Sequence, residues 1–245
     1  MPTAMITGGA SWFSRETAKR LVADGWTVCL SDINEKNLNE VVGEINGGKR
    51  VETALLNVTD LESVKKYVNG VIERHSAIDA LANVAGGSNY LQMKRIPFHE
   101  MKPENWDLIF KPNIYGVLNC CYAVLPHMIK ANKGSIVNIA SGMALRGQAL
   151  SSTYSTAKAA IVAFTQSLCQ EVGKHNIRVN SIAPGSAESR WAPDLKGGGG
   201  TGGLSPLGDR TTAEDVAKAI LFLISDRSSH VTGTCLDISG GISLH

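Results

Sequence analysis

Short apolar runs rich in β-branched residues alternate with longer stretches of helical periodicity from one end of this sequence to the other. Such alternation predicts parallel strands joined by crossover helices, which are right-handed almost without exception. We therefore predict an α/β fold in which a doubly wound, seven-stranded parallel sheet is the middle of a three-layer α/β/α sandwich. The expected strands are Thr3–Ile6, Thr27–Ser31, Val51–Leu56, Ala80–Asn83, Ser135–Ala140, Arg178–Ala183 and Thr234–Ile238. The expected helices lie near Arg15–Asp24, Glu35–Asn46, Leu61–Arg74, Pro103–Lys130, Thr153–Lys174 and Thr212–Ile224.

The length and composition agree with one globular domain over residues 1–245. Hydrophobic residues make up 43% of the chain and charged residues 19%, and the formal net charge is +2. Without a dense Lys/Arg block, nucleic acid and anionic membrane are unsupported as partners. We find no run of about 18 apolar residues that would span a bilayer, and no signal-like start. A cytoplasmic location is the expectation.

The cysteines predict neither disulfides nor a metal site. Their number, five, is odd, they show no C-x-x-C pair, and most lie in apolar runs, so we expect reduced core residues. The six histidines form no H-E-x-x-H motif and no Cys/His cluster of metal-binding spacing. We therefore expect no metal site.

One segment, residues 187–210, interrupts the alternation with six glycines in the seven positions from Gly197 to Gly203. A flexible surface loop is one interpretation, because glycine loses the most entropy on ordering. The other is a mobile lid that closes over substrate and excludes water. We favour the lid, because the segment follows a candidate cofactor loop.

The first expected strand ends in a glycine turn that feeds a helix, as in Rossmann-type dinucleotide sites. The turn runs from Gly8 through Ser11, Trp12 and Phe13, and the helix dipole with its free N–H groups favours a pyrophosphate there. The second strand ends in Asp32, followed by Ile33. A carboxylate at that place accepts from both adenosine ribose hydroxyls and repels a 2′-phosphate. Because neither Ser11 nor Ile33 supplies a cation, we expect NAD rather than NADP.

A serine, a tyrosine and a lysine give the strongest functional signal. Tyr154 and Lys158 lie one above the other on a helical face, and Ser141 directly follows a predicted strand. We expect the Lys158 ammonium to lower the phenol pKa by charge attraction, so that Tyr154 can act as a general acid and base. The Ser141 hydroxyl would orient the substrate oxygen and stabilise its developing charge. This set predicts hydride transfer between a dinucleotide and a carbinol or carbonyl carbon.

The whole chain resembles the short-chain dehydrogenase/reductase family in its compact, single-domain form. The resemblance rests on motifs spread along the sequence: Thr7-Gly8, Asn83-Val84-Ala85-Gly86, Asn113, Ser141, Tyr154-Ser155-Thr156-Ala157-Lys158, Pro184-Gly185, Pro206-Leu207-Gly208 and Gly233 to Gly241. It implies that Tyr154 is the acid and base, that Ser141 holds the substrate oxygen, and that Lys158 also binds the nicotinamide ribose. It further implies that Asn113 positions a water in a proton relay.

The same resemblance implies a cofactor pocket of several loops. The adenine would lie against Asn57 and Val58, although family members usually carry Asp where Asn57 stands. The residues expected to line the rest of the dinucleotide are Asn83, Ala85, Gly86, Pro184, Gly185, Ala187 and Ser189.

Two residues depart from the family pattern in the phosphate turn. Trp12 stands where a second glycine lets the main chain approach the pyrophosphate, and Ser14 replaces the third glycine. One hypothesis is that the turn keeps its path, with the indole outward. The rival is that Trp12 fills the phosphate site, which would leave a binding or scaffold protein without turnover.

The substrate is the least determined part of the prediction. Beside Ser141, the substrate residues we expect are Met143, Arg146 and Trp191, within a wider set of flanking loop residues: Gly87, Ser88, Leu145, Gln148, Leu150 and Arg190. NAD favours oxidation of a secondary alcohol, and a 3-ketoacyl-type reductase is the alternative within the family. The resemblance also implies a homo-oligomer, a tetramer or dimer.

Overall fold

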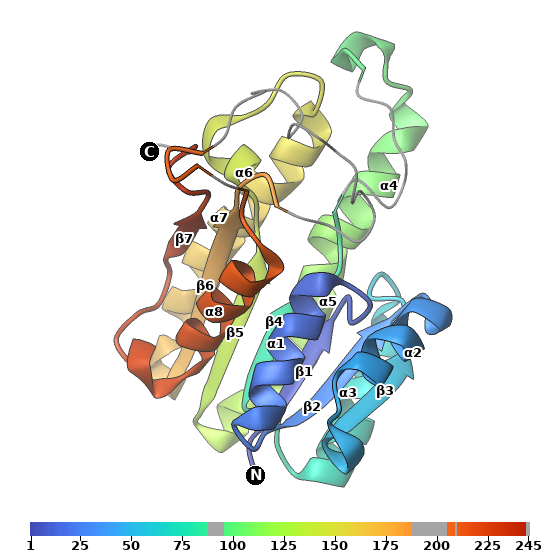
Figure 1. The fold of residues 1–245 in the computed structure, drawn as a ribbon, viewed down its shortest axis with the longest axis vertical. Helices are drawn as coiled ribbons and strands as arrows, with labels where there is room; N and C mark the ends of the chain where they lie inside the picture. Colours follow the sequence, from blue (N-terminus) through green and yellow to red (C-terminus); the bar gives the residue numbers. More distant parts are fainter. Residues whose placement is uncertain (88–95, 188–204, 209, 244–245) are drawn as a thin grey trace.

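A computed structural model describes residues 1–87, 96–187, 205–208 and 210–243 of the chain. Its seven strands form one parallel sheet in the order β3-β2-β1-β4-β5-β6-β7, so the predicted doubly wound sheet is confirmed (Figure 1). The strand order reverses between β1 and β4, which is where such sheets bind ligands. The strands are β1 (Thr3–Thr7), β2 (Thr27–Asp32), β3 (Val51–Leu55), β4 (Ala80–Asn83), β5 (Gly134–Ile139), β6 (Ile177–Pro184) and β7 (Cys235–Ile238).

Helices cover both faces of the sheet, which completes the expected three layers (Figure 1). On one face, α1, α2 and α8 bury side chains such as Leu21 and Ile220 against Ile6 and Leu30 of the sheet. The main helices are α1 (Trp12–Ala23), α2 (Glu35–Glu44), α3 (Leu61–His75), α4 (Trp106–Phe110), α5 (Gly116–Ala131), α6 (Gly142–Arg146), α7 (Ser152–Val172) and α8 (Ala213–Ile224).

The opposite face is covered by α3, α5 and α7. Its core includes Val68 of α3, Val124 of α5 and Ile161 of α7, packed on Met5 and Ile136 of the sheet. Successive strand residues alternate between the two cores because side chains of a strand point to opposite faces in turn. Both faces are therefore apolar, as expected for a buried parallel sheet.

The stretch expected as one helix over Pro103–Lys130 is broken by a π-helical turn, η5 (Lys111–Tyr115). Pro112 lies in this turn and has no N–H to donate to the preceding turn, which disfavours a regular α-helix there. Single π-turns of this kind occur often at functional sites. The break places Asn113, which is fully buried, against the loop that follows β4.

By length and composition, the run Pro103–Ala131 is the one stretch of the described chain long and apolar enough to cross a membrane. The sequence was expected to hold no such stretch, because polar and charged residues such as Asp107, Lys111 and Asn113 interrupt its apolar runs. Within the fold, 44% of the most apolar window is buried, and α5 packs in the core beneath the sheet. Packing against the sheet accounts for its apolar character.

All five cysteines are unpaired, as the sequence predicted. Cys29, Cys120 and Cys121 are buried, whereas Cys169 and Cys235 are partly exposed. Burial raises the pKa of the Cys29 and Cys121 thiols to about 12, so both are protonated at neutral pH.

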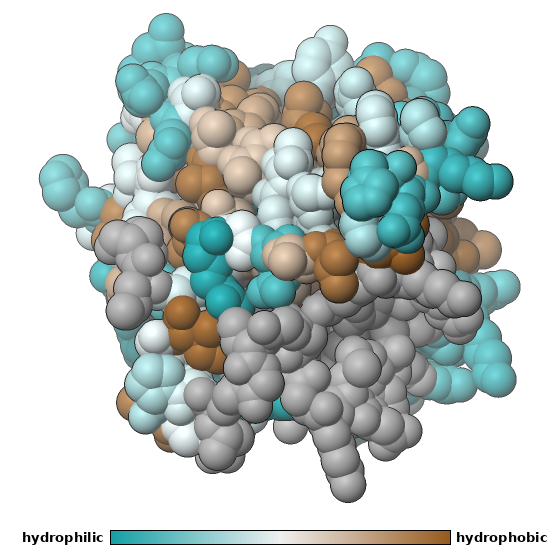
Figure 2. Space-filling view, turned by 90° about the horizontal axis from the view of Figure 1, so that it is seen from above, coloured by the Kyte–Doolittle hydropathy of each residue, from teal (hydrophilic) through white to brown (hydrophobic). Residues whose placement is uncertain are grey.

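The carboxyl ends of the strands gather at one end of the molecule. Figure 2 looks down on this end and shows hydrophobic residues interspersed with hydrophilic ones over the coloured part of the surface. Most of the predicted lid segment 187–210 lies outside the residues that the structure describes. The lid therefore stays a prediction.

Candidate active site

Ser141 and Tyr154 meet just beyond the end of β5. Ser141 begins the short helix α6 and accepts the Met143 N–H at 3.2 Å with its hydroxyl. The phenol of Tyr154 lies in the first turn of α7, near enough to Ser141 for the serine hydroxyl to lower its pKa. Two side chains thirteen positions apart in sequence are thus brought together beyond the end of β5.

Lys158 lies one helical turn after Tyr154 on α7. Its Nζ is 5.8 Å from the centre of the tyrosine ring and donates to the Ile139 carbonyl at 2.8 Å. The Lys158 side chain is 2% exposed. The hydrogen bond to the last residue of β5 fixes the ammonium beside the sheet, so the three predicted catalytic side chains form one group.

The pKa values of this group differ from what the sequence suggested. Burial raises the pKa of Tyr154 to about 12, although the hydrogen bond from Ser141 opposes that rise. Burial lowers the pKa of Lys158 to about 7. Lys158 is not among the groups that shift the tyrosine pKa here, because desolvation disfavours the charged form of both groups. The expectation that the Lys158 charge lowers the tyrosine pKa therefore stays a prediction for the protein with a bound dinucleotide.

The Asn113 side chain holds the loop that follows β4. Its Oδ1 accepts the Gly87 N–H at 2.7 Å, and its Nδ2 donates to the carbonyls of Gly87 at 3.0 Å and Ile109 at 2.9 Å. A Cβ on Gly86 would lie 2.6 Å from Asn113 Oδ1. The two predicted residues Asn113 and Gly86 therefore belong to one tightly packed corner, which only glycine at position 86 permits.

The phosphate turn keeps the path expected of a dinucleotide-binding turn. Gly8 has φ of +66°, and a Cβ there would lie 2.7 Å from the Ala85 nitrogen, so glycine is required. Ser11 caps α1 by accepting the Ser14 N–H at 3.2 Å. The first N–H groups of α1 have no acceptor within the helix and point out of its end, which suits a pyrophosphate.

Ser14 stabilises the turn in a way that the sequence alone did not reveal. The serine is fully buried, its hydroxyl donates to the Gly8 carbonyl at 2.8 Å, and it accepts from the Ser11 hydroxyl at 3.0 Å. A glycine there would leave these partners without the hydroxyl. The replacement of the third glycine therefore adds a side-chain link between the helix and the turn.

Trp12 begins α1 without backbone strain. It is not among the described non-glycine residues with positive φ, which are Ser76, Asn132, Leu150 and Asn176. Its ring lies 5.7 Å from the guanidinium carbon of Arg15, one turn along the same helix. Phe13 packs partly against the core of α1, α2 and α8. The indole therefore stacks on the surface of its own helix, in agreement with the hypothesis of an outward tryptophan.

Asp32 ties the end of β2 to the phosphate turn. One carboxylate oxygen accepts the Ala10 N–H at 3.0 Å and the other accepts the Asn34 N–H at 2.9 Å. Ile33 beside it is 65% exposed. Each oxygen has further lone pairs, so the carboxylate fits the proposed ribose contact while it fixes the neighbouring main chain.

The residues expected around the adenine follow β3, and Asn83, expected further along the dinucleotide, ends β4. Asn57 is exposed, and its Oδ1 accepts the Thr59 N–H and hydroxyl, whereas Val58 is buried. The Asn83 side chain points away from the predicted pocket, because it donates to Asn138 at 2.9 Å within the core. Only the main chain of Asn83 can therefore contact a dinucleotide.

The loop after β6 is also positioned as predicted, as far as it is described. A Cβ on Gly185 would lie 2.8 Å from Ser239 Cα, so glycine lets the two segments approach. Ala187 pairs with Thr211 in an isolated parallel bridge, and Pro184 ends β6. Ser189 lies outside the described residues.

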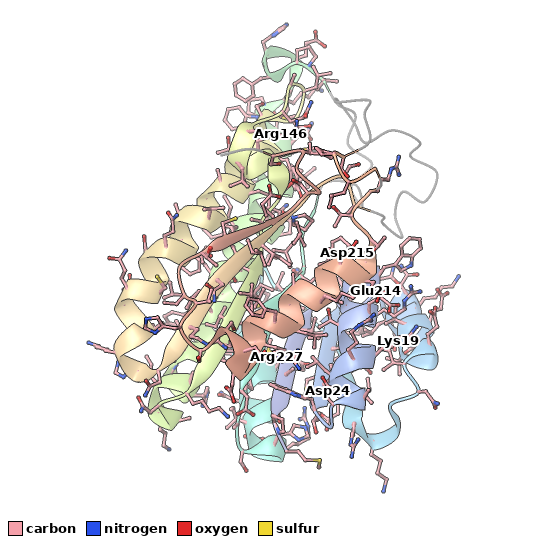
Figure 3. The ribbon with its side chains drawn as sticks, turned by 60° about the vertical axis from the view of Figure 1, so that its left-hand side comes forward. Lys19, Asp24, Arg146, Glu214, Asp215 and Arg227 are labelled. Atoms are coloured by element: carbon pink, nitrogen blue, oxygen red, sulfur yellow. The ribbon has the colours of Figure 1, made fainter. Side chains whose placement is uncertain are left out.

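Of the predicted substrate residues, Met143 and Arg146 belong to α6. Arg146 is exposed at the carboxyl end of the sheet, opposite to Asp24 and Arg227 at the other end (Figure 3). Leu150, which just precedes α7, has φ of +62°, a strained conformation for a non-glycine residue and one that is common near active sites. Trp191, Arg190 and Ser88 lie outside the described residues.

The fold also gathers three side chains that the motif search could not find. Cys29, Glu52 and His75 place their ligand atoms within 4.8 Å of one another, and they are the one group of this kind among the described residues. They lie 23 positions apart in sequence, far beyond the short spacings that identify metal sites. Only the pairing of β2 with β3 could have revealed them.

Comparison with known proteins agrees with this geometry. The model of the family described as short chain dehydrogenase matches residues 2–196. The 3-oxoacyl-(acyl-carrier-protein) reductase of Thermotoga maritima is 38% identical over 242 residues, which cover 97% of this chain and 96% of the relative. The corresponding reductase of Chlamydia trachomatis is 34% identical over 98% of this chain and 97% of its own length.

Solved structures match over the whole fold. The 3-ketoacyl-(acyl-carrier-protein) reductase from Brucella melitensis complexed with NADH has a TM-score of 0.90 at 27% identity, covering 99% of this chain and 98% of that one. NAD⁺-bound xylitol dehydrogenase has a TM-score of 0.89 at 27% identity, covering 98% of each chain. On its sequence, fold and matching family model, this chain belongs to the short-chain dehydrogenase family of oxidoreductases.

Proposed function

We propose that this protein transfers a hydride between NAD(H) and the carbinol or carbonyl carbon of a secondary alcohol or ketone. The observation that carries the proposal is the position of the Lys158 Nζ, 5.8 Å from the centre of the Tyr154 ring, with the Ser141 hydroxyl near enough to the phenol to lower its pKa. A phenol, a hydroxyl and an amine so arranged can give a proton to, or take it from, one substrate oxygen.

In this mechanism Tyr154 moves the proton and Ser141 positions the oxygen. During reduction the phenol, protonated at neutral pH because burial raises its pKa, gives its proton to the substrate oxygen as negative charge develops there. The Ser141 hydroxyl donates to the same oxygen. The bound dinucleotide supplies the hydride in reduction and accepts it in oxidation.

Lys158 would hold the nicotinamide ribose and supply positive charge beside the phenol. Its Nζ donates one hydrogen bond to the Ile139 carbonyl, and an ammonium has two further N–H donors for ribose hydroxyls. A positive charge there favours the phenolate that forms when the proton leaves Tyr154. Asn113 would support this reaction by holding the Gly86–Gly87 corner. We also propose that Asn113 positions the water of the proton relay that the sequence predicted.

We favour NAD over NADP because of Asp32. Its carboxylate ends β2 beside the phosphate turn and would repel a 2′-phosphate while accepting from ribose hydroxyls. Arg15, the basic residue closest in sequence to the turn, is engaged with Glu16 at 3.0 Å and Glu44 at 2.8 Å. Its guanidinium is therefore already paired with Glu44 and with Glu16, which Lys19 and Arg20 also contact.

The alternative of a different class is a scaffold whose dinucleotide groove is filled by Trp12. Two observations support the enzyme instead: the unstrained start of α1 at Trp12, and the contact of the indole with Arg15. A scaffold also has no physical need for a buried lysine beside a tyrosine and a serine.

A second candidate function is reduction of a 3-oxoacyl thioester. It is favoured by the Thermotoga and Chlamydia relatives, whose names assign that reaction to them at 38% and 34% identity. The chemistry at Tyr154 would be the same, and the substrate would differ by its thioester carrier.

The test is a panel of secondary alcohols, ketones and a short 3-oxoacyl thioester, each assayed with both dinucleotides by absorbance of the dihydronicotinamide. The proposal expects turnover of an alcohol–ketone pair with NAD(H). Turnover confined to the thioester would establish the second candidate. Absence of turnover, together with no heat of NADH binding in calorimetry, would favour the scaffold.

We also propose that the protein is a homo-oligomer that pairs through α5. Tyr115, which immediately precedes α5, and Tyr122 and Ile129 of α5 are spaced seven apart and remain 56%, 63% and 37% exposed. Such spacing puts them in one stripe along the helix. Sedimentation equilibrium of the wild-type protein and of Tyr122→Glu tests this proposal, which expects the variant to dissociate.

A further inference from the structure

A second cluster of reactive side chains lies on the sheet at the β3 edge, away from the proposed active site. Cys29 of β2 and Glu52 of β3 are direct partners in the parallel register, so their side chains point to the same face. That face is covered by α3, which ends at His75. Cys29 precedes Asp32 by three residues, about 10 Å along the strand.

The three side chains are already in contact or close to it. His75 Nε2 lies 2.9 Å from Glu52 Oε1, and the ligand atoms of Cys29, Glu52 and His75 all lie within 4.8 Å of one another. Ligands around a tetrahedral Zn²⁺ lie about 3.3–3.6 Å apart, from its usual bond lengths to sulfur, nitrogen and oxygen. Movement of about 1 Å would therefore be enough to close the site.

We propose that Cys29, Glu52 and His75 bind a zinc ion that joins the edge strand β3 to helix α3. A thiolate, an imidazole and a carboxylate together suit Zn²⁺, whereas Ca²⁺ and Mg²⁺ select oxygen ligands alone. The fourth ligand is a water. Binding releases the thiol proton of Cys29 to solvent, because the thiolate is the form that coordinates a metal.

An unpartnered phenol beside the cluster supports a ligand there. Tyr67 Oη of α3 is buried without a hydrogen-bond partner among the described residues, an arrangement that costs free energy unless something satisfies it. The phenol also interacts electrostatically with Cys29 and Glu52. A zinc-bound water next to the phenol would supply the missing hydrogen bond.

A cavity gives the ion a path to the cluster. A solvent-open cavity of about 770 Å³ lies along β3 and α3 and is lined by Glu52, Tyr67 and Arg74. The side chains of Glu52 and His75 are 30% and 19% exposed, whereas Cys29 is fully buried. An ion entering from solvent would thus meet the carboxylate and imidazole first, and the thiol beneath them.

Arg74 competes with a bound ion for the Glu52 carboxylate. Its Nε donates to Glu52 Oε2 at 2.9 Å, which leaves Oε1 on the His75 side for coordination. The guanidinium repels a cation nearby, so its removal is expected to tighten metal binding. This effect is specific to a site at Glu52 and distinguishes it from metal held elsewhere on the surface.

The test is titration of the metal-free, reduced full-length protein with Co²⁺, which takes zinc sites and gives a thiolate-to-metal charge-transfer band. We expect one Co²⁺ per chain with that band, displaced by Zn²⁺, and a tighter titration for Arg74→Gln. Zinc at about 100 times its dissociation constant should raise the Tm by roughly 5–10 °C.

Two variants and a matched control make the test decisive. Cys29→Ala should abolish the band and the Tm rise, and His75→Gln should weaken binding while leaving the fold intact, because the histidine is partly exposed. Cys169→Ala, which removes a partly exposed cysteine outside the cluster, should behave as wild type. No charge-transfer band in wild type, or a band that survives Cys29→Ala, would overturn the proposal.

Discussion

The Nζ of Lys158 lies 5.8 Å from the centre of the Tyr154 ring, one turn further along α7. Burial moves the pKa values of the two groups in opposite directions, to about 7 for the lysine and about 12 for the tyrosine. Near neutral pH it is therefore the lysine that titrates. The positive charge available to support a phenolate changes over the pH range in which the protein would work.

The lysine pKa predicts a pH-dependent stability. An unfolded lysine has a pKa near 10.4, so between pH 7 and 10 the unfolded chain binds more protons than the folded one. Stability then rises with pH, by up to about 1.4 kcal/mol per unit from this group. Between pH 7.0 and 8.5, the free energy of unfolding measured in urea should rise by up to about 2 kcal/mol more in wild type than in Lys158→Met.

The difference between the two proteins isolates this lysine, because both carry the same histidines and cysteines. The pH range of this experiment, 7.0 to 8.5, also stays below the raised pKa values of the buried thiols, about 12 for Cys29 and Cys121. An identical pH dependence of wild type and Lys158→Met would show that the Lys158 pKa is not lowered.

Ser14→Ala should destabilise the protein although alanine favours helices. The change removes the hydroxyl that donates to the Gly8 carbonyl at 2.8 Å. That carbonyl keeps the Ser11 N–H at 3.1 Å, so we expect the cost of one lost hydrogen bond, about 0.5–1.5 kcal/mol. Urea unfolding measures the loss. Ser155→Ala is the matched control, because that buried hydroxyl has no hydrogen-bond partner among the described residues and should be lost at little cost.

Asp32→Ser should shift the dinucleotide preference toward NADPH. The carboxylate would no longer repel a 2′-phosphate or accept from ribose hydroxyls, and we expect the ratio of NADH to NADPH affinity to fall by about tenfold or more, which is 1.4 kcal/mol. Calorimetry with both dinucleotides measures this ratio. Asp24→Asn, at the opposite end of the molecule (Figure 3), should leave it unchanged, and a wild type that prefers NADPH would refute the role of Asp32.

Trp12 should report dinucleotide binding. If the indole lies along the pyrophosphate edge, NADH will quench its fluorescence or receive energy from it. The sequence contains three other tryptophans, so the signal is the part of the change that disappears in Trp12→Phe. Calorimetry on the same variant should still detect NADH binding. A wild type that gives neither heat nor quenching would support the scaffold alternative.

Most of the fold could be predicted because the periodicity of apolar residues and the residues that end helices and strands indicate the same elements along this chain. β4 was predicted with the bounds that it has, Ala80–Asn83, since a short apolar run there is closed by polar residues. The break before α5 was missed because apolar periodicity continues through Pro112, and only the three-dimensional packing of Asn113 reveals the π-turn. Helix α6 was missed because its five residues are too few for periodicity.

The part of the site that depends on residues close together in the sequence could be predicted. Tyr154 and Lys158 share a helical face, and that relation is local. The direction of the Asn83 side chain depends on a partner 55 positions away, and the low pKa of Lys158 depends on burial by the whole fold. The hydroxyl of Ser14 could be seen as a departure from a glycine, but its bond to Gly8 required the folded turn.

The most direct measurement of the central claim is the turnover of Tyr154→Phe with the best alcohol–ketone pair, together with its affinity for NADH. The account predicts that turnover falls by about 10²–10⁴-fold, the usual contribution of a general acid and base, while NADH binding stays close to wild type. Tyr122→Phe, an exposed tyrosine of α5, should retain activity. Substantial turnover by Tyr154→Phe with NADH bound would contradict the proton-transfer role proposed for this phenol.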